Sequence, residues 1–246
     1  MKIALLPLAA AAFVLQSCAT DSPLMLDTSR FPVAKVETKT FKKGQPTSED
    51  SIFPQVAAQD FTRITGQWSP KGATAYTETG TYYGATKYHW WSVEVFLTAP
   101  ERARKAIESA SDGYKADLGS ATNASARIYP RFERKEFDWG DAVSFFVQYQ
   151  NDNTNYVPNN GMLTYEVHGL TRDGRYVTAS FGVTHPELVE FGPEVRDYRD
   201  GDPADPGSAM RRDPHYRLVE TAPPDAFEPS LAEIDAFLNT LKINQR

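Results

Sequence analysis

Three segments in the second half of the chain alternate apolar and polar residues with a period of two, the pattern of β-strands that turn one face to a core. The segments span residues 142–150, 162–170 and 176–184. The pattern predicts a three-stranded antiparallel meander at the centre of the fold. The first face is expected to hold Val143, Phe145, Val147, Tyr149, Leu163, Tyr165, Val167, Val177, Ala179, Phe181 and Val183. The second face is expected to hold Phe146, Met162, Leu170 and Tyr176 among its polar residues, so something should cover part of it too.

The turn between the second and third segments sets how these two strands pair. A two-residue loop would place apolar residues of one strand opposite polar residues of the other. A three-residue loop over 172–174 aligns the apolar faces and sets Tyr165 opposite Phe181. Gly174 would then take the left-handed backbone conformation of a bulged hairpin.

Shorter patterns predict the elements around the meander. Ser230 is followed three residues later by Glu233, which is a capping box and predicts the start of a helix with an apolar stripe. Pro100 suits the first turn of another helix, and Gly66 is placed to end a third. The expected elements are a strand at 33–41, a helix at 53–64, a hairpin at 73–83 and 88–97, a helix at 98–115, a strand at 126–137 and the final helix from 230 onward.

Together these patterns predict a single α+β domain over residues 48–246, with an antiparallel sheet of about six strands flanked by helices. Residues 187–228 hold 11 acidic and 5 basic residues and are rich in proline. We expect this segment to be a long irregular loop that docks through apolar residues near its two ends and stays exposed from about 197 to 212. The whole chain has a net charge of −6 and a pI near 5.3, which argues against nucleic acid as a partner.

The start of the chain has the pattern of a targeting segment. Lys2 precedes an apolar run over 3–15 that is too short to span a bilayer as a mature helix. The run ends in Leu15-Gln16-Ser17-Cys18, which resembles the lipobox of bacterial lipoproteins. Gln16 departs from the small residue usual at its position.

This resemblance implies that residues 1–17 are a signal peptide and that Cys18 carries acyl chains such as palmitate. Cys18 is the only cysteine of the chain, so no disulfide is available to an exported protein. Ala19, in place of aspartate after the cysteine, implies by the same resemblance the outer membrane, with the domain in the periplasm or at the cell surface. Residues 18–47 would form the lipidated N-terminus and a tether, flexible over 19–31, that lets the domain stand off the membrane.

The order of predicted elements and three local phrases resemble the PsbP-like family. The phrases are at residues 169–177, 183–186 and 238–243. Domains of this family place an antiparallel sheet between helices, so the resemblance implies an α/β/α sandwich. Its members are mainly binding or accessory modules, so the resemblance also implies a non-enzymatic role.

Polar and aromatic residues on the predicted sheet are the candidate contacts for a ligand. Glu166 and His168 share one face, with Thr178 opposite His168, and they form either a solvent-facing pair or a small acid–base site. Trp90 has the opposite parity to the core residue Trp91 and is the better candidate for an exposed contact. Catalysis would need a nucleophile or a positioned water with an orienting partner, so we assign no catalytic residue and no cofactor.

Two classes of function remain open at this point. The first is a lipid-anchored binding or accessory module of the cell envelope, with an envelope protein as its partner. The second is an envelope hydrolase whose site lies on the polar face of the sheet. A sheet buried on both faces would favour the first class. A pocket lined by His168, Glu166 and a third converging polar group would favour the second.

A group of aspartates in the proline-rich segment raises the question of a calcium site. The residues are Asp197, Asp200, Asp202 and Asp205. Their spacing does not match an EF-hand loop, which needs ligands at alternate positions and a glutamate at the twelfth. The alternatives are a cation site and a solvated acidic loop.

Overall fold

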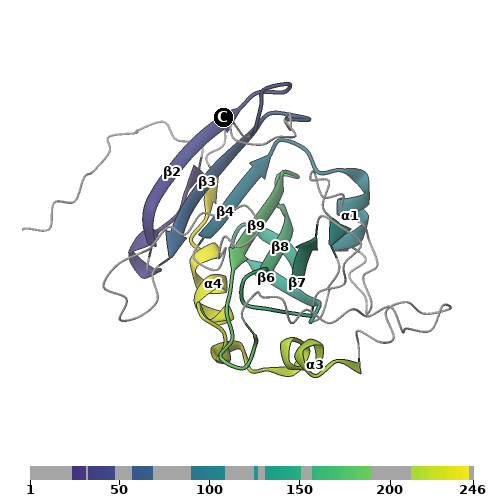
Figure 1. The fold of residues 1–246 in the computed structure, drawn as a ribbon. Coiled ribbons are helices and arrows are strands. Elements are labelled where there is room, and N and C mark those ends of the chain that lie inside the picture. The colour runs from purple at the N-terminus through teal and green to yellow at the C-terminus, as the bar shows by residue number, and fades with distance from the viewer. Residues whose placement is uncertain are drawn as a thin grey trace, which may run out of the picture.

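The computed structural model describes residues 24–31, 33–47, 57–68, 90–108, 125–126, 131–150, 157–189 and 212–243, and its largest element is one antiparallel sheet (Figure 1). The strand order is β2-β3-β4-β9-β8-β7-β5, with β6 also paired to β7. The strands of this sheet are β2 (Val33–Phe41), β3 (Phe61–Trp68), β4 (Trp90–Phe96), β5 (Ser125–Ala126), β6 (Glu133–Phe137), β7 (Gly140–Gln150), β8 (Leu163–Thr171) and β9 (Tyr176–Gly182). A two-stranded sheet pairs β1 (Leu24–Met25) with β10 (Lys242–Ile243). The helices are η1 (Thr28–Arg30), α1 (Glu101–Glu108), α3 (Pro214–Thr221), η3 (Pro224–Ala226) and α4 (Leu231–Leu238).

The predicted meander is confirmed, because β7, β8 and β9 pair in chain order. Tyr165 lies opposite Phe181, as the three-residue loop requires. Gly174 has a φ of +85°, and its N–H donates to the carbonyl of Thr171 at 2.9 Å. The turn chemistry therefore determines the register of the two central strands.

Replacing Gly174 with valine should lower the free energy of unfolding by roughly 1 to 2 kcal/mol, because a β-branched residue is strained in the left-handed region. Chemical denaturation of the two proteins measures this loss. Gly174→Asn is the matched control, since asparagine tolerates the left-handed conformation far better. Equal losses in both variants would show that the backbone conformation is not the cause.

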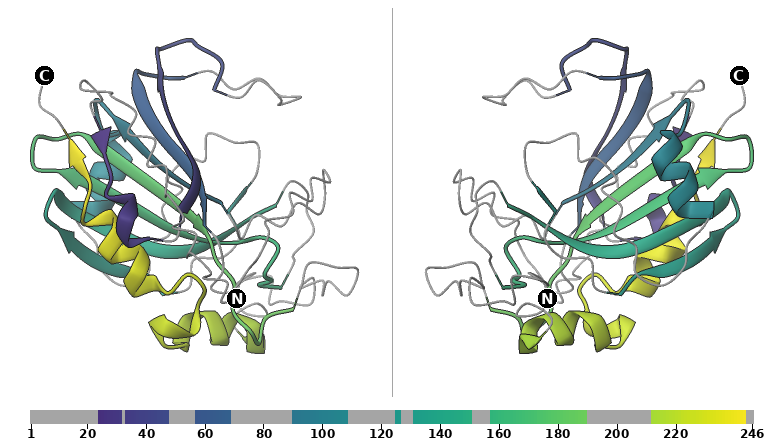
Figure 2. Two further views of the ribbon diagram at one scale, coloured as in Figure 1. Left: turned by 90° about the vertical axis from the view of Figure 1, so that its left-hand side faces the viewer. Right: turned by 90° about the vertical axis from the view of Figure 1, so that its right-hand side faces the viewer.

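One face of the sheet packs on the C-terminal helix, and we call it the α4 face (Figure 2). Phe237 of α4 meets the ring of Trp91 from β4 edge-on at 5.1 Å. The predicted capping box is confirmed: the Ser230 hydroxyl accepts the N–H of Glu233, and the Glu233 carboxylate accepts the N–H of Ser230. The local sequence therefore places the start of α4 so that its apolar stripe meets the sheet.

Residues 24–31 also pack on the α4 face, so the expectation of a flexible tether over 19–31 is wrong for this part. Leu24 pairs with Ile243 in the β1–β10 sheet. Leu24 and Phe31 are 4% and 3% exposed, and the Phe31 ring stacks on Phe237 at 4.8 Å. The anchored segment and tether predicted before residue 24 lie outside the described residues.

The opposite face packs on α1, and we call it the α1 face (Figure 2). Ala103 and Ile107 of α1 share a buried apolar cluster with Val143, Phe145 and Val147 of β7. The predicted faces of β7 were therefore wrong. Both faces of this strand are covered, so apolar residues occur at both parities and the alternation does not reveal which set faces which layer.

The register shows the correction for β7 directly. Val143 lies opposite His168 and Phe145 opposite Glu166, on the α1 face. Phe146 lies opposite Tyr165, on the α4 face. The first predicted apolar set of the meander is thus split between the two faces of the sheet.

Strand β3 replaces the second half of the helix predicted at 53–64, so that prediction was wrong. Ile64 of β3 belongs to the core of the α4 face, whereas Phe61 stacks on Phe96 at 4.8 Å on the α1 face. Their three-residue spacing thus reflects a strand with apolar residues on both faces. Gly66 does not end a helix; a Cβ at this position would meet the Trp91 ring at 2.6 Å.

Several other predicted elements are confirmed where the structure describes them. They are the strand at 33–41 as β2, the strand at 88–97 as β4, the N-terminal half of the helix at 98–115 as α1, and the end of the strand at 126–137 as β6. The predicted strand at 73–83 lies outside the described residues, but its predicted hairpin with 88–97 is wrong, because β4 is already paired with β3 on one side and β9 on the other.

The segment 187–228 is more regular than expected. The apolar docking points are confirmed near both ends, since Leu188 is 5% and Val219 0% exposed. The expectation of irregular structure is wrong for its C-terminal part, where Asp213 caps helix α3 by accepting the N–H of His215. Residues 190–211, with the expected exposed region, lie outside the described residues.

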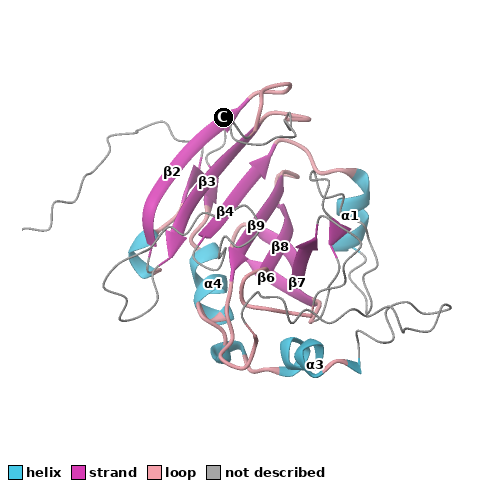
Figure 3. Ribbon diagram, viewed as in Figure 1, coloured by secondary structure: helices cyan, strands magenta, loops and turns pink. Residues whose placement is uncertain are grey.

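The α+β class with a large antiparallel sheet is confirmed, but the α/β/α sandwich is not. Within the described ranges, the helices cover only part of each face and form no continuous layer: α1 lies on one face, and α4 together with the buried Val219 of α3 lies on the other (Figure 3). The rest of the α4 face is covered by β1, η1 and β10 together with the segment that precedes α4. Among these same residues no helix has both the length and the apolar character needed to cross a membrane.

Candidate functional site

Two rows of polar side chains cross the α1 face from β3 to β8. The antiparallel register sets these residues side by side, although they come from four strands that are distant in the sequence. Cross-strand neighbours lie about 5 Å apart at Cβ, so each row is a continuous line of contacts. We call the two rows together the polar band, which consists of Arg63, Glu94, Thr178 and His168 in one row and Thr65, Ser92, Ser180 and Glu166 in the other.

Glu166 and His168 form the inner end of the polar band, and they are buried. Their exposures are 3% and 8%, so the solvent-facing alternative considered for this pair was wrong. His168 Nε2 lies 3.2 Å from Glu166 Oε2, and its Nδ1 lies 2.7 Å from the Tyr176 hydroxyl. The Ser180 hydroxyl donates to the Glu166 carboxylate at 2.8 Å.

These contacts satisfy each polar atom of the pair in one arrangement of hydrogens. With the ring proton on Nε2, His168 donates to Glu166 and accepts the Tyr176 hydroxyl proton at Nδ1. A buried carboxylate needs such donors, because its desolvation is costly when it is left unpaired. At the inner end of the band, hydrogen bonds therefore link four residues in a continuous series: Ser180, Glu166, His168 and Tyr176.

Apolar neighbours from β7 and α1 explain why this pair is buried. The Phe145 ring lies 5.2 Å from the His168 ring, and Val143 lies opposite His168 in the sheet. Ile107 of α1 packs in the same cluster as Phe145 and Tyr176. The inner end of the polar band thus lies under α1, whereas its outer end on β3 and β4 does not.

The outer end of the band is built on an ion pair. Arg63 Nε lies 2.5 Å from Glu94 Oε1, with the two side chains 26% and 19% exposed. The Arg63 guanidinium also lies over the Phe41 ring, 5.0 Å from its centre, and donates to the Thr47 carbonyl at 3.1 Å. Thr178 donates to the other Glu94 oxygen at 3.5 Å, which continues the row toward β8. The outer end is half-buried, and its one cation and one anion balance in charge.

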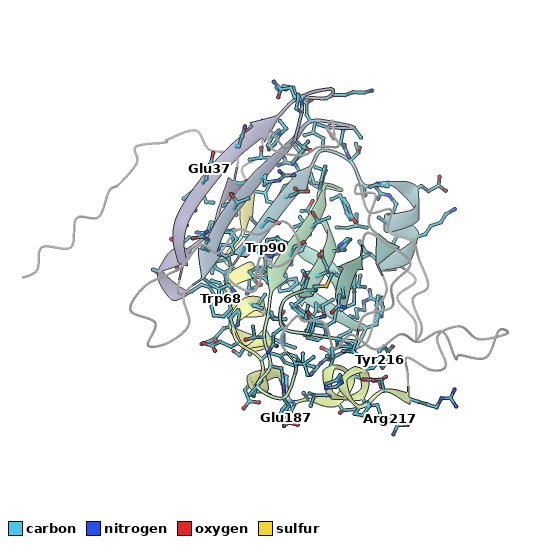
Figure 4. All side chains as sticks on the ribbon, viewed as in Figure 1. Glu37, Trp68, Trp90, Glu187, Tyr216 and Arg217 are labelled. Carbon is cyan, nitrogen blue, oxygen red and sulfur yellow. The ribbon has the colours of Figure 1, made fainter. Side chains whose placement is uncertain are left out.

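Trp90 lies on the same face, two residues before Ser92 on β4 (Figure 4). It pairs with Gln67 of β3 in the row next to Ser92 and is half-buried. Its Nε1 is buried with no hydrogen-bond partner among the residues that the structure describes. The structure therefore places all three predicted contact residues, Trp90, Glu166 and His168, on one face of the sheet.

Reasoning from the sequence missed several members of this site. Arg63 was missed because its segment was assigned to a helix, which hides its pairing with Glu94. Ser180 and Tyr176 were on the predicted polar parity of β9, and the correct register already set Ser180 opposite Glu166. The signal for these two was present, but their convergence on one carboxylate and one imidazole depends on side-chain direction.

A second polar cluster lies on the α4 face, where Lys135 of β6 contacts Asp235 of α4 and Glu133 at 2.9 Å each. The Tyr165 hydroxyl donates to Asp235 at 3.3 Å. Burial raises the pKa of Asp235, although Lys135 acts in the opposite direction. Burial also raises the pKa of the Tyr165 hydroxyl, so this phenol is a poor base and nucleophile. We assign the cluster a structural role, since it joins two strands to α4.

The predicted lipidation site and the predicted cation ligands cannot be placed. Cys18 and the aspartates 197, 200, 202 and 205 all lie outside the described residues. Among the residues that are described, no group of three or more histidine, cysteine, aspartate or glutamate side chains has a geometry that could hold a metal ion. The two alternatives for these aspartates, a cation site and a solvated acidic loop, are therefore not tested by the described residues.

Comparison with known proteins gives no relative: no family model, no curated protein and no solved structure matches this chain. Function must therefore be argued from the residues alone.

Proposed function

We propose that the protein is a lipid-anchored component of the bacterial cell envelope that acts as a binding or accessory module. The lipobox-like stretch that ends at Cys18 supports the anchor, and Cys18 is the only cysteine available for it. Ala19 supports the outer membrane as destination, with the domain in the periplasm or at the cell surface. An envelope protein that binds the polar band would be its partner.

We prefer binding over hydrolysis because of the order in which Ser180, Glu166, His168 and Tyr176 are hydrogen-bonded. In a serine hydrolase the imidazole stands between the hydroxyl and the carboxylate, because it must take the proton of the nucleophile. Here the carboxylate of Glu166 stands between Ser180 and His168. Tyr176 occupies the other nitrogen of His168 at 2.7 Å. Both ring nitrogens of His168 are therefore already hydrogen-bonded, and neither is free to activate Ser180.

The alternative function, an envelope hydrolase on the polar face, rests on the convergence of these same groups. Glu166, His168, Ser180 and Tyr176 come from two neighbouring strands and meet within hydrogen-bond distance. For hydrolysis, His168 would have to leave Glu166 or Tyr176 and reach Ser180. Burial under α1 opposes that exchange.

The half-buried outer part of the polar band is the contact surface that we propose. Thr65, Ser92 and Thr178 offer hydroxyl groups there, and Trp90 offers an aromatic ring beside them. Hydroxyl groups and a tryptophan at the edge of such a surface suit a polar partner that also presents an apolar group. The charges of Arg63 and Glu94 neutralise each other, so this pair does not favour a strongly charged partner.

Ser92→Arg should remove partner binding, because the added side chain would lie over the half-buried outer end of the band. The measurement is quantitative cross-linking in intact cells, followed by recovery of the protein from detergent-solubilised envelope. Ala236→Arg adds the same side chain at an exposed position of α4, on the opposite face of the sheet, and should keep the wild-type partners. Trp90→Ala should weaken the same partners without adding bulk.

Two outcomes would contradict this proposal. Equal recovery of partners with Ser92→Arg and Ala236→Arg would show that the polar band is not the contact surface. Specific labelling of Ser180 in the folded protein by a fluorophosphonate, which reacts with activated serines, would favour the hydrolase instead. Thermal unfolding of both arginine variants verifies that each remains folded.

We also propose that the fold is related to the PsbP-like family. Two of the phrases on which the resemblance was based support this relation: the β8–β9 turn region at 169–177, and residues 238–243, which run from the last residue of α4 through β10. Helices that cover only part of each face are a departure from the sandwich that the resemblance implies.

A further inference from the structure

The N-terminal end of the described chain is fastened to the C-terminal end of the domain. Leu24 and Met25 pair with Ile243 and Lys242. The Asp27 N–H then donates to the Thr240 hydroxyl at 2.9 Å. We call residues 24–31 and 240–243 the N-terminal clip, which Figure 2 shows as purple β1 and η1 beside yellow β10 and α4.

Buried side-chain contacts hold the clip to the domain, in addition to the short β1–β10 pairing. Leu24 is 4% exposed, and Phe31 stacks on Phe237 at 4.8 Å and meets Phe181 edge-on at 6.0 Å. Burying these two large apolar side chains stabilises the docked state, because both are removed from water. The chain therefore joins the domain at Leu24, seven residues before Phe31.

This early attachment limits how far an acylated Cys18 can lie from the domain. The six residue steps from Cys18 to Leu24 span at most roughly 22 Å when fully extended. A domain of this length has a radius of gyration of about 17 Å, and so a diameter of roughly 40 Å. The anchor is therefore shorter than the domain is wide, and it restricts which edge can face the bilayer.

The outer surface of the clip has the chemistry of a membrane contact. Met25 is 56% exposed, one of four large apolar side chains so exposed among the described residues. Its cross-strand partner Lys242 is also exposed. An apolar side chain beside a cation suits the boundary between acyl chains and anionic headgroups. Asp27, the acid nearest along the chain, is exposed as well, and its carboxylate accepts the N–H of Ser29 at 3.0 Å and the Ser29 hydroxyl proton at 2.5 Å.

We propose that the N-terminal clip is a membrane-contact edge, with Met25 and Lys242 held at the phospholipid headgroups of the bilayer in which Cys18 is anchored. This inference rests on the proposed lipidation of Cys18. The domain then lies close to the membrane in one orientation and does not stand off on a tether. Because the clip is on the α4 face, the polar band on the α1 face stays open to a partner.

A fluorescent probe at residue 25 tests this orientation. Met25→Cys is expressed with its natural signal, purified from the envelope in detergent, labelled with an NBD maleimide and reconstituted into phosphatidylethanolamine–phosphatidylglycerol vesicles. Acylation of Cys18 consumes its thiol, so the new cysteine is the labelling site. The readout is quenching by a lipid that carries a nitroxide near its headgroup.

The control is Glu101→Cys, an exposed position at the start of α1 on the opposite face. We expect the probe at residue 25 to be quenched several-fold more than the probe at residue 101. Lys242→Cys should behave like Met25→Cys, since the two residues are paired across the clip.

Vesicle flotation separates the two ways in which this experiment can fail. Labelled protein that does not float with the vesicles contradicts the lipidation itself, and with it the inference. Protein that floats while the probes at 25, 242 and 101 are quenched equally leaves the lipid anchor intact and overturns the oriented contact.

Discussion

Phe237→Ala is expected to lower the free energy of unfolding by about 3 to 5 kcal/mol, the range for removing a fully buried phenylalanine. Phe237 is 1% exposed and lies between the sheet and the N-terminal clip. It stacks on Phe31 at 4.8 Å and meets Trp91 at 5.1 Å and Phe181 at 6.2 Å. The cavity left by alanine would adjoin three rings on three separate elements, so local collapse cannot fill it cheaply.

Denaturant titration and calorimetry of a soluble form that lacks residues 1–18 measure this effect. For a domain of this size the loss corresponds to a fall in Tm of roughly 6 to 20 °C. Leu97→Ala is the control, because Leu97 is 61% exposed and its truncation should change stability by less than about 0.5 kcal/mol. A similar small change for Phe237→Ala would mean that α4 does not pack as described.

Cys18→Ala is expected to move the protein from the membrane fraction to the soluble fraction and to abolish fatty-acid labelling. Each buried methylene of an acyl chain contributes about 0.8 kcal/mol, so two or three chains dominate the membrane affinity. A single lysine near an anionic surface adds only about 1 kcal/mol. Met25 and Lys242 can therefore orient an anchored domain, but they cannot retain one that has lost its anchor.

Fractionation of cells and labelling with a radioactive or clickable fatty acid measure this result. Ser17→Ala keeps a small residue before the cysteine and should still be labelled and retained. Met25→Ala should also be retained, because it leaves the acyl chains unchanged. If the alanine variant of Cys18 still fractionates with membranes and still incorporates fatty acid, the proposed anchor is wrong.

The sequence predicted best those elements whose signals are local. The capping box at Ser230 and Glu233 placed the start of α4, and the Gly174 turn fixed the pairing of β8 with β9. Each of these signals rests on backbone requirements within a few residues. Long-range packing was not needed to read them.

Predictions that assumed one buried face were the ones that failed. Phe61 and Ile64 are three residues apart, a spacing that fits one face of a helix. The same spacing fits a strand whose two faces are both apolar, an alternative that the prediction did not consider. Phe145 and Phe146 are adjacent and lie on opposite faces of β7, where both are buried. A sheet covered on both sides removes the alternation on which strand faces are assigned.

The N-terminal clip and the buried site were hidden for a different reason. Leu24 pairs with Ile243, more than two hundred residues later, and no local sequence pattern predicts such a pairing. Glu166 and His168 carry the same parity in the sequence whether α1 covers them or not. Their burial follows from where α1 packs, and that is a property of the tertiary structure.

Mass spectrometry of the N-terminal peptide of the mature protein, isolated from the envelope, is the most direct test of the lipid-anchored assignment. We expect this peptide to begin at Cys18 and to carry the added mass of the thioether-linked diacylglycerol and its acyl chains. A mature N-terminus at another residue, or an unmodified Cys18 thiol, would contradict the assignment.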